Sequence, residues 1–527
     1  MAKVKIQGHA SGTGVITITA PNTDTDRTIT LPDESITLSA GTTTLGGLTD
    51  VSMDITNFAD SLLIQPDSDG SAPTTGTLSS ASENIGIGKD VFAALTSATW
   101  NTAIGSNAAL VLTTGQSNAA LGYYALSSNT TGSSNVAIGR RALNSNTTAS
   151  NNTAVGRDAL NGNTTGTSNV SVGYKSLYST TTSDGNTAIG YECMYSNTSG
   201  QNNVAIGISA LDAVNTGDSN VAIGHTAMTT NTTGHENVAI GRSAMYNNTT
   251  GADNVAVGYS AMDNNTTGVE NTAIGFHALK VNTTGNNSTA VGKGALGAQT
   301  SNGNNSAFGI NSLAAVTTGQ NNIGIGIQAA GAQTDRNDSI AIGREAMNHA
   351  NQTNGYRNIC IGNYTDTNAT DSADQIVMGY DVMGQADLTF TFGKAGSDTK
   401  CGFGSTSWSN PSDERIKKDI TTSTAGLGFI NDLRPVTFKY KNEGDIPEGF
   451  QGYVKDSATP IQNALTNHGF IAQEVKTAIN NHSELKDGFD MWDEGSDGRQ
   501  RIGDTALIPI LVKAIQELSA KITILEG

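Results

Sequence analysis

The sequence predicts a mainly β protein built around a long repeat shaft, with a small β-rich module before the shaft and an α+β domain after it. Three observations carry this prediction. Glycines recur every 17 residues through the central part of the chain. Charged residues make up 14% and aromatic residues 5% of 527 residues, which disfavours one large packed core and suits a β structure with many turns. A charge-rich segment of different composition begins near residue 410.

The first 83 residues divide into two segments. Residues 1–40 contain short runs in which apolar and threonine side chains alternate, and Pro and Gly separate these runs. Such runs are typical of strands, so we expect a β-rich module there. Residues 41–83 are rich in Gly, Ser and Thr and are expected to form a linker or neck.

The 17-residue period is the strongest signal and defines a shaft over residues 84–395. Its consensus is Asn-x-Ala-Ile-Gly-x-x-Ala-Leu-x-x-Asn-Thr-Thr-Gly-x-x, and residues 237–251 are a clean copy. The phase slips by two residues before Gly362. The periodic glycines are Gly88, Gly105, Gly122, Gly139, Gly156, Gly173, Gly190, Gly207, Gly224, Gly241, Gly258, Gly275, Gly292, Gly309, Gly326, Gly343, Gly362 and Gly379.

One repeat is too short to bury its apolar side chains alone, but stacked repeats can do so. Ala239 and Ile240 are adjacent, so they face opposite sides of a strand. One side can line the inside of the coil, and a neighbouring chain is the simplest partner for the other. We therefore predict a parallel homotrimer, either a β-roll or an interwound β-helix, whose repeats would stack to roughly 85 Å.

The Asn-Thr-Thr-Gly segments also match the N-glycosylation sequon, as at Asn129. We interpret them as turns in which Asn and Gly supply left-handed backbone conformations. Cys193 and Cys360 fall where neighbouring repeats carry Ala or Ser, and we expect them, with Cys401, to be small core residues. The histidines of the shaft share no repeat phase, so we expect no metal ladder.

Residues 412–527 hold 31 charged residues in 116, against 45 in the preceding 411. We expect a separate globular domain there, joined to the shaft by a distal connector over residues 396–411. Its pattern predicts a short helix over residues 423–433, a strand over residues 436–440 and a further helix from Phe470.

The last segment has apolar residues at alternating spacings of three and four, which is typical of a heptad seam. We predict a short trimeric coiled coil. One amphipathic helix that packs this stripe on its own domain is the alternative. The seam residues are Ile508, Leu511, Ile515, Leu518, Ile522 and Leu525.

Two families resemble parts of the chain. The repeat units resemble the head repeats of trimeric autotransporter adhesins and related shafts of phage fibres, which implies a trimeric β architecture. The segments SDERIKKDI (residues 412–420), LRPVTFKY (residues 433–440) and HGFIAQEV (residues 468–475) resemble the intramolecular chaperone at the C-termini of phage endosialidases, tail fibres and tailspikes.

The chaperone resemblance implies that this domain nucleates a trimer, folds the shaft and then cuts the chain before its first Ser. Its nucleophile and base map to Ser412 and Lys417, and its cleaved bond to that between Pro411 and Ser412. A Ser hydroxyl needs a base, and a lysine can serve when burial or a cationic neighbour lowers its pKa. This would be a single-turnover serine autoprotease, with no multiple-turnover activity expected. The residues alone leave open that Ser412 is only a helix N-cap.

Together, the resemblances imply a homotrimeric tail fibre of a phage virion that attaches to a host. Its N-terminal module would dock on the tail or another virion protein. The distal part would meet a host receptor, either a glycan or an outer-membrane protein. The alternatives are a glycan-degrading tailspike and a non-tail virion fibre or trimeric surface adhesin.

A net charge of −18 argues against a nucleic-acid partner. The sequence has no apolar segment typical of a signal peptide or a membrane span, so we expect synthesis in the host cytoplasm and no membrane insertion. No cofactor and no metal is expected.

Two regions are candidates for binding or catalysis. Residues 344–411 contain the slip in the period and a cluster of aromatic residues, which favours receptor binding at the distal end. Glu236, Asp253 and Glu270 share one repeat position, but glycoside hydrolysis needs two carboxylates in a cleft. We interpret these three as solvated turn residues.

Overall fold

The computed structural model describes residues 51–52, 58–59, 61–64, 79–213, 215–348, 355–369, 371–405, 408–409, 412, 414–450, 452–486, 489, 491–495 and 498–526. The chain divides into two compact units, residues 1–411 and residues 412–527. The module expected at residues 1–40 lies outside the described residues.

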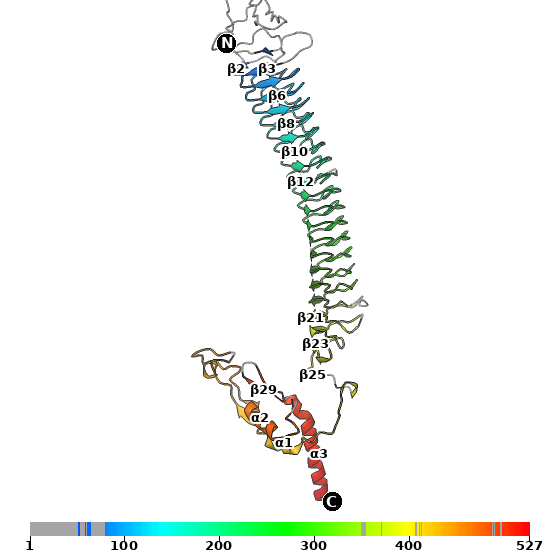
Figure 1. Ribbon diagram of the computed structural model, residues 1–527, viewed down its shortest axis with the longest axis vertical. Helices are drawn as coiled ribbons and strands as arrows, with labels where there is room; N and C mark the ends of the chain where they lie inside the picture. The colour runs from blue at the N-terminus through cyan, green and yellow to red at the C-terminus, as the bar shows by residue number, and fades with distance from the viewer. Residues whose placement is uncertain are drawn as a thin grey trace, which may run out of the picture. The chain divides into compact units, whose positions relative to one another are not determined.

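The first unit is a β-solenoid in which each strand pairs with the next one along the same chain (Figure 1). In its described part, eighteen strands from β5 to β22 stack in parallel and in register. Val204 pairs with Val221, 17 residues on, and Ile340 pairs with Ile359, where the two extra residues enter. Because the neighbours belong to one chain, the interwound alternative does not describe this shaft.

The stacked strands are β5 (Ile85–Ile87), β6 (Thr102–Ile104), β7 (Ala119–Leu121), β8 (Val136–Ile138), β9 (Thr153–Val155), β10 (Val170–Val172), β11 (Thr187–Ile189), β12 (Val204–Ile206), β13 (Val221–Ile223), β14 (Val238–Ile240), β15 (Val255–Val257), β16 (Thr272–Ile274), β17 (Thr289–Val291), β18 (Ser306–Phe308), β19 (Ile323–Ile325), β20 (Ile340–Ile342), β21 (Ile359–Ile361) and β22 (Ile376–Tyr380).

Both ends of the stack depart from this pattern. At the start, β1 (Val51–Ser52) pairs antiparallel with β3 (Leu62–Ile64), β3 pairs in parallel with β5, and β2 (Phe58–Ala59) pairs with β4 (Ala81–Ser82). At the far end, β22 pairs in parallel with β23 (Thr389–Lys394). The antiparallel strands β24 (Ser397–Gly402) and β25 (Trp408–Ser409) then end the sheet.

The interior is a set of columns of small and apolar side chains. Ala239, in the middle of β14, is fully buried, whereas Ile240 beside it keeps 37% of its surface exposed, as the alternation predicts. Ala244 and Met245 line two further buried columns. The three cysteines are buried as predicted, and desolvation raises the pKa of Cys193 to about 12, so its thiol is a packing group.

Two ladders of buried asparagine side chains run between the rungs. Nδ2 of Asn237 donates to Oδ1 of Asn220 at 3.1 Å and to the carbonyl oxygen of Gly251 at 2.8 Å. Nδ2 of Asn248, in the second ladder, donates to Oδ1 of Asn231 at 2.8 Å and to the same carbonyl at 3.0 Å. Each side chain therefore satisfies backbone groups that the turns leave inside the coil.

The prediction that Asn and Gly of the Asn-Thr-Thr-Gly turns supply left-handed backbone conformations is wrong in part. Asn248 and Gly251 do not have positive φ; the left-handed residues of this rung are Glu236, Ser243 and Met245, with φ of 51–55°. Gly251 is required by space instead, because a Cβ there would lie 2.4 Å from Oδ1 of Asn248. Gly241 is needed on both grounds: its φ is +135°, and a Cβ would meet the carbonyl oxygen of Gly258 at 2.4 Å.

Two charged residues enter the interior near the slip. Arg336 stands where most other repeats carry Gly and is 1% exposed. Asp366 stands where most of them carry Leu or Met and is 6% exposed. Nη1 of Arg336 lies 3.0 Å from Sδ of Met347. Burial lowers the pKa of Arg336 to about 10, while nearby Cys360 and Asp366 act in the opposite direction.

The second unit is a small α+β domain. Its elements are η1 (Glu414–Ile416), α1 (Leu427–Asp432), β26 (Val436–Phe438), η2 (Glu443–Asp445), β27 (Asn467–Gly469), α2 (Ala472–Asn481), β28 (Trp492–Glu494), β29 (Gln500–Ile502), η3 (Asp504–Ala506) and α3 (Leu507–Glu526). Phe429, Val475, Ile479, Met491 and Ile510 are central to its core. Of the helices in the described residues, none has the length and apolar character of a membrane span.

Candidate functional site

Ser412 and Lys417 meet at the start of the second unit. Between them η1 turns the chain, and the amide of Lys417 donates to the carbonyl oxygen of Glu414 at 3.1 Å. Nζ of Lys417 then lies 2.7 Å from Oγ of Ser412. Residues five apart in an extended chain would be about 17 Å apart, so this single turn creates the pair.

The contact has the geometry of a nucleophile and its base. A charged lysine donates a hydrogen bond to Oγ, and a neutral lysine accepts the hydroxyl proton along the same line. Both side chains are exposed in the single chain. Pro411, which carries the carbonyl of the predicted scissile bond, lies outside the described residues.

The fold brings together the two downstream segments that carry the chaperone resemblance. β26 and β27 pair antiparallel, with Val436 opposite Gly469. Arg434 donates through Nε to Oε2 of Glu474 at 2.9 Å, an exposed ion pair between the same two segments. The sequence similarity in these blocks therefore corresponds to one contiguous part of the domain.

His482 joins the ends of α1 and α2 and was not singled out by the sequence. Its Nε2 lies 2.9 Å from Oδ2 of Asp432, and its Nδ1 lies 3.1 Å from Oε1 of Glu484. The imidazole also packs edge-on against Phe429, with 5.4 Å between ring centroids. Hydrogen bonding to Asp432, and then to Glu484, raises the pKa of His482, because only the protonated ring donates from both nitrogens.

A carboxylate from α3 caps the N-terminus of α1. The backbone N–H of Leu427, the first residue of α1, donates to Oε2 of Glu517 at 2.9 Å, and Gly426 supplies no side-chain cap of its own. Lys513, one turn earlier on α3, lies 3.7 Å from the same carboxylate. α3 is thereby fixed to the domain through its polar face as well as through Leu507, Ile510 and Ala514, which are buried.

The predicted seam lies on a different face of α3 from these buried residues. All six seam side chains are exposed in the single chain, by 41% to 85%. The stripe that packs on the domain is therefore not the heptad stripe, contrary to the alternative of a helix that only packs on its own core. The exposed residues are Ile508, Leu511, Ile515, Leu518, Ile522 and Leu525.

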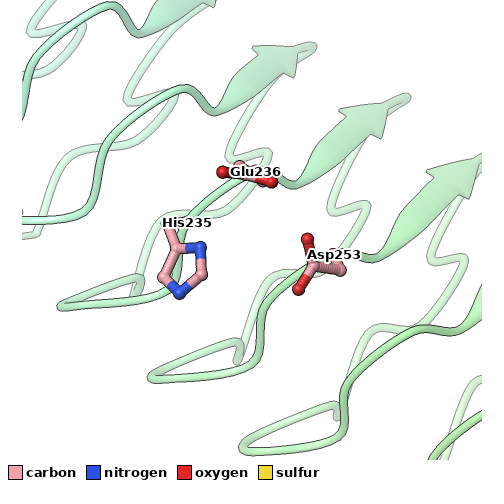
Figure 2. Close-up of side chains that lie close together, drawn as sticks. All are labelled: His235, Glu236 and Asp253. Atoms are coloured by element: carbon pink, nitrogen blue, oxygen red, sulfur yellow. The ribbon is translucent and has the colours of Figure 1, made fainter.

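The shaft carboxylates considered for glycoside chemistry are exposed. Figure 2 shows His235 and Glu236 on one rung and Asp253 on the next, and ligand atoms of the three lie within 4.8 Å of one another. Glu270 lies at the same position one rung further on and is also exposed. This surface belongs to a regular stretch of shaft, so it offers none of the enclosure that glycoside hydrolysis needs.

The distal rungs carry aromatic side chains and a hollow. Tyr380 and Phe403 are exposed, and the guanidinium of Arg344 lies over the ring of Tyr364, 4.6 Å from its centroid. An open pocket of about 290 Å³ lies in the same region. It is lined by Glu345, Asn348, Tyr364, Asp366, Asp381, Val382 and Met383.

Comparison with known proteins identifies one part of the chain. Residues 412–483 match the family model described as the chaperone of endosialidase, which is 72 of the 527 residues. No curated protein and no solved structure matches the chain. The match at the C-terminus and the β-solenoid shaft fit a protein of the tail-fibre or endosialidase type that carries an intramolecular chaperone.

Proposed function

We propose that the protein is a homotrimeric fibre of a tailed phage whose C-terminal unit assembles three chains and then releases itself. The observation that carries the proposal is the 2.7 Å contact between Ser412 and Lys417. It stands at the first residue of the family match and of the second compact unit. A nucleophile at this position would separate the chaperone from the shaft with nothing left over.

The reaction follows from the contact. Oγ of Ser412 attacks the carbonyl carbon of Pro411 as Lys417 takes the hydroxyl proton. The C–N bond between Pro411 and Ser412 then breaks, and the proton passes from Lys417 to the leaving amine of Ser412. Water hydrolyses the resulting ester, which leaves a carboxylate on Pro411 and restores the hydroxyl. Each chain reacts once.

Two features of the single chain fit cleavage after assembly. The exposed stripe of α3 offers an apolar seam to two further copies. The dyad is exposed in one chain, whereas a lysine base works best where water is excluded. Cleavage is therefore expected in the trimer and not in the free chain.

A denaturing gel of the purified protein tests the proposal. Wild type should release a fragment of residues 412–527, and Ser412→Ala and Lys417→Ala should remain full length. Lys418→Ala is the matched control, because this neighbouring lysine is also exposed. Equal cleavage in all four proteins would point to a contaminating protease and overturn the assignment of the dyad.

Receptor binding is proposed for residues 344–411, at the distal end of the shaft. The pocket supports this place, as do the exposed Tyr380 at the end of β22 and the exposed Phe403 in a turn, because exposed aromatic side chains commonly contribute to recognition of sugars and proteins. Tyr380→Ala with Phe403→Ala should reduce adsorption of the purified fibre to host cells at least tenfold, whereas Tyr123→Ala, in the regular shaft, should not. Equal adsorption of the three proteins would move the receptor site elsewhere.

A further inference from the structure

The outward face of the solenoid carries one uninterrupted apolar column, which we call the outer ladder. It consists of the third residue of each strand from β5 to β22, directly before the periodic glycine. Eleven of its side chains keep 36–45% of their surface exposed, and the others are half-buried. The ladder is Ile87, Ile104, Leu121, Ile138, Val155, Val172, Ile189, Ile206, Ile223, Ile240, Val257, Ile274, Val291, Phe308, Ile325, Ile342, Ile361 and Met378.

Other outward-facing positions of the repeat can be compared with this column. The position two residues further on, just after each glycine, also faces outward but varies freely and accepts charge, for example Arg157, Arg242 and Lys293. The turn position occupied by Glu236 and Asp253 accepts carboxylates. No residue of the outer ladder is polar or charged over its whole length. A column open to water would not exclude polar side chains at every rung.

The first residue of each strand faces the same way and is also uncharged in every repeat, mostly Val, Thr or Ile. The second residue is the buried one, as Ala239 shows beside Val238 and Ile240. The outward face is therefore an uncharged, largely apolar strip, and the variable position just after the glycine, with its Arg, Lys and Tyr side chains, borders it. An apolar centre with a polar and aromatic rim is the usual composition of a protein interface.

The spacing of the ladder selects the partner. Its members are stacked one per rung, about 4.8 Å apart. A globular partner could match only a few rungs, whereas a second solenoid of the same rise matches all of them. Among the surfaces of the described residues, the same ladder on another copy of this chain has that spacing along the whole stack. The exposed seam of α3 is a separate feature that also favours association of parallel copies.

We propose that the outer ladders of three parallel copies meet at the common three-fold axis, each residue facing its own counterparts. This inference rests on the trimer proposed above and adds which face of the shaft is buried in it. In a closed three-fold assembly, identical residues can meet only around the axis, so a single column per chain is enough. Ile240 should then be near Ile240 of its neighbours, and Glu236, on the same rung, should face solvent.

Cysteine crosslinking in the full chain tests this inference. Ile240→Cys, treated with copper phenanthroline or with bismaleimidoethane, should give a two-chain band on a denaturing gel. One chain of each trimer stays unlinked because three thiols cannot pair evenly. Glu236→Cys is the matched control, exposed on the same rung, and should give none. The buried native cysteines should give no such band in wild type.

Sedimentation of the same samples distinguishes a failure of the proposed ladder interface from a failure of the proposed trimer. Trimers in which Ile240→Cys does not crosslink, or crosslinks no better than Glu236→Cys, would overturn the ladder interface and leave the proposed fibre intact. Monomers at micromolar concentration would overturn both. Trimers with a band for Ile240→Cys alone are the expected result.

Discussion

The asparagine ladders predict a rescue that can be tested within one rung. One natural rung replaces the first Asn with Ser288 and the second with Gln299, and Nε2 of Gln299 donates to Oγ of Ser288 at 3.1 Å. The longer amide fills the space that the shorter side chain leaves. The corresponding residues in the central shaft are Asn237 and Asn248.

Asn237→Ala removes a fully buried side chain whose Oδ1 accepts from both the backbone N–H and Nδ2 of Asn254, each at 3.1 Å. An orphaned buried N–H costs about 1–3 kcal/mol, and each lost hydrogen bond adds about 1 kcal/mol. We therefore expect a loss of about 3 kcal/mol per chain for Asn237→Ala and about 2 kcal/mol for Asn237→Ser. The double variant Asn237→Ser with Asn248→Gln reproduces the natural pair, so its stability should lie within about 1 kcal/mol of wild type.

The rate of unfolding in guanidinium chloride is the appropriate measurement, because a long shaft in the proposed trimer is expected to unfold irreversibly. A loss of about 3 kcal/mol corresponds to roughly 100-fold faster unfolding if the ladder is broken in the transition state. Asn247→Ala, at a half-buried position with one bond of 2.9 Å to Asn264, is the control and should have a much smaller effect. Unfolding of Asn237→Ala at the control's rate, or no rescue by Asn248→Gln, would refute the role of the ladders.

Two other perturbations follow from the structure. Arg336→Met should destabilise the distal rungs by about 3–5 kcal/mol because it removes a positive charge near the buried Asp366, and Asp366→Leu should restore most of that loss in the double variant. Hydrogen exchange over residues 330–390 would measure both effects, and a double variant worse than the single variant would contradict the reasoning. The second concerns pH: because the folded pKa of His482 is raised, its stabilisation is full below the unfolded value of about 6.5 and is lost as the pH rises through the folded pKa. Thermal melting of the second unit in the Ser412→Ala chain should therefore fall over that window and stay flat in His482→Gln, and identical pH profiles would disprove the assignment.

The repeat pattern was sufficient to predict the shaft, because one period governs strand position, inward Ala and outward Ile together. Ala239 and Ile240 lie as predicted, and the slip before Gly362 is the place where the register lengthens. The backbone of the turns could not be predicted in this way. Left-handed conformations fall on Glu236, Ser243 and Met245, because stacking of the rungs overrides local preference.

The site was predictable only where local chain geometry determines it. Ser412 and Lys417 are five residues apart and one turn joins them, so their contact depends on no distant element. The pairing of His482 with Asp432 spans 50 residues, and no spacing rule connects them. Arg336 and Asp366 did leave a signal, since each interrupts a column that other repeats keep small or apolar.

Intact mass spectrometry of the purified wild-type protein tests the central claim most directly. The account predicts that the 54.2 kDa chain disappears with time and gives two products. The smaller product should begin with a free amine on Ser412 and run to Gly527, and the larger should end in a carboxylate on Pro411. A full-length mass that persists through prolonged incubation of assembled trimers would contradict self-cleavage, and the C-terminal unit would then be a chaperone that stays attached to the fibre.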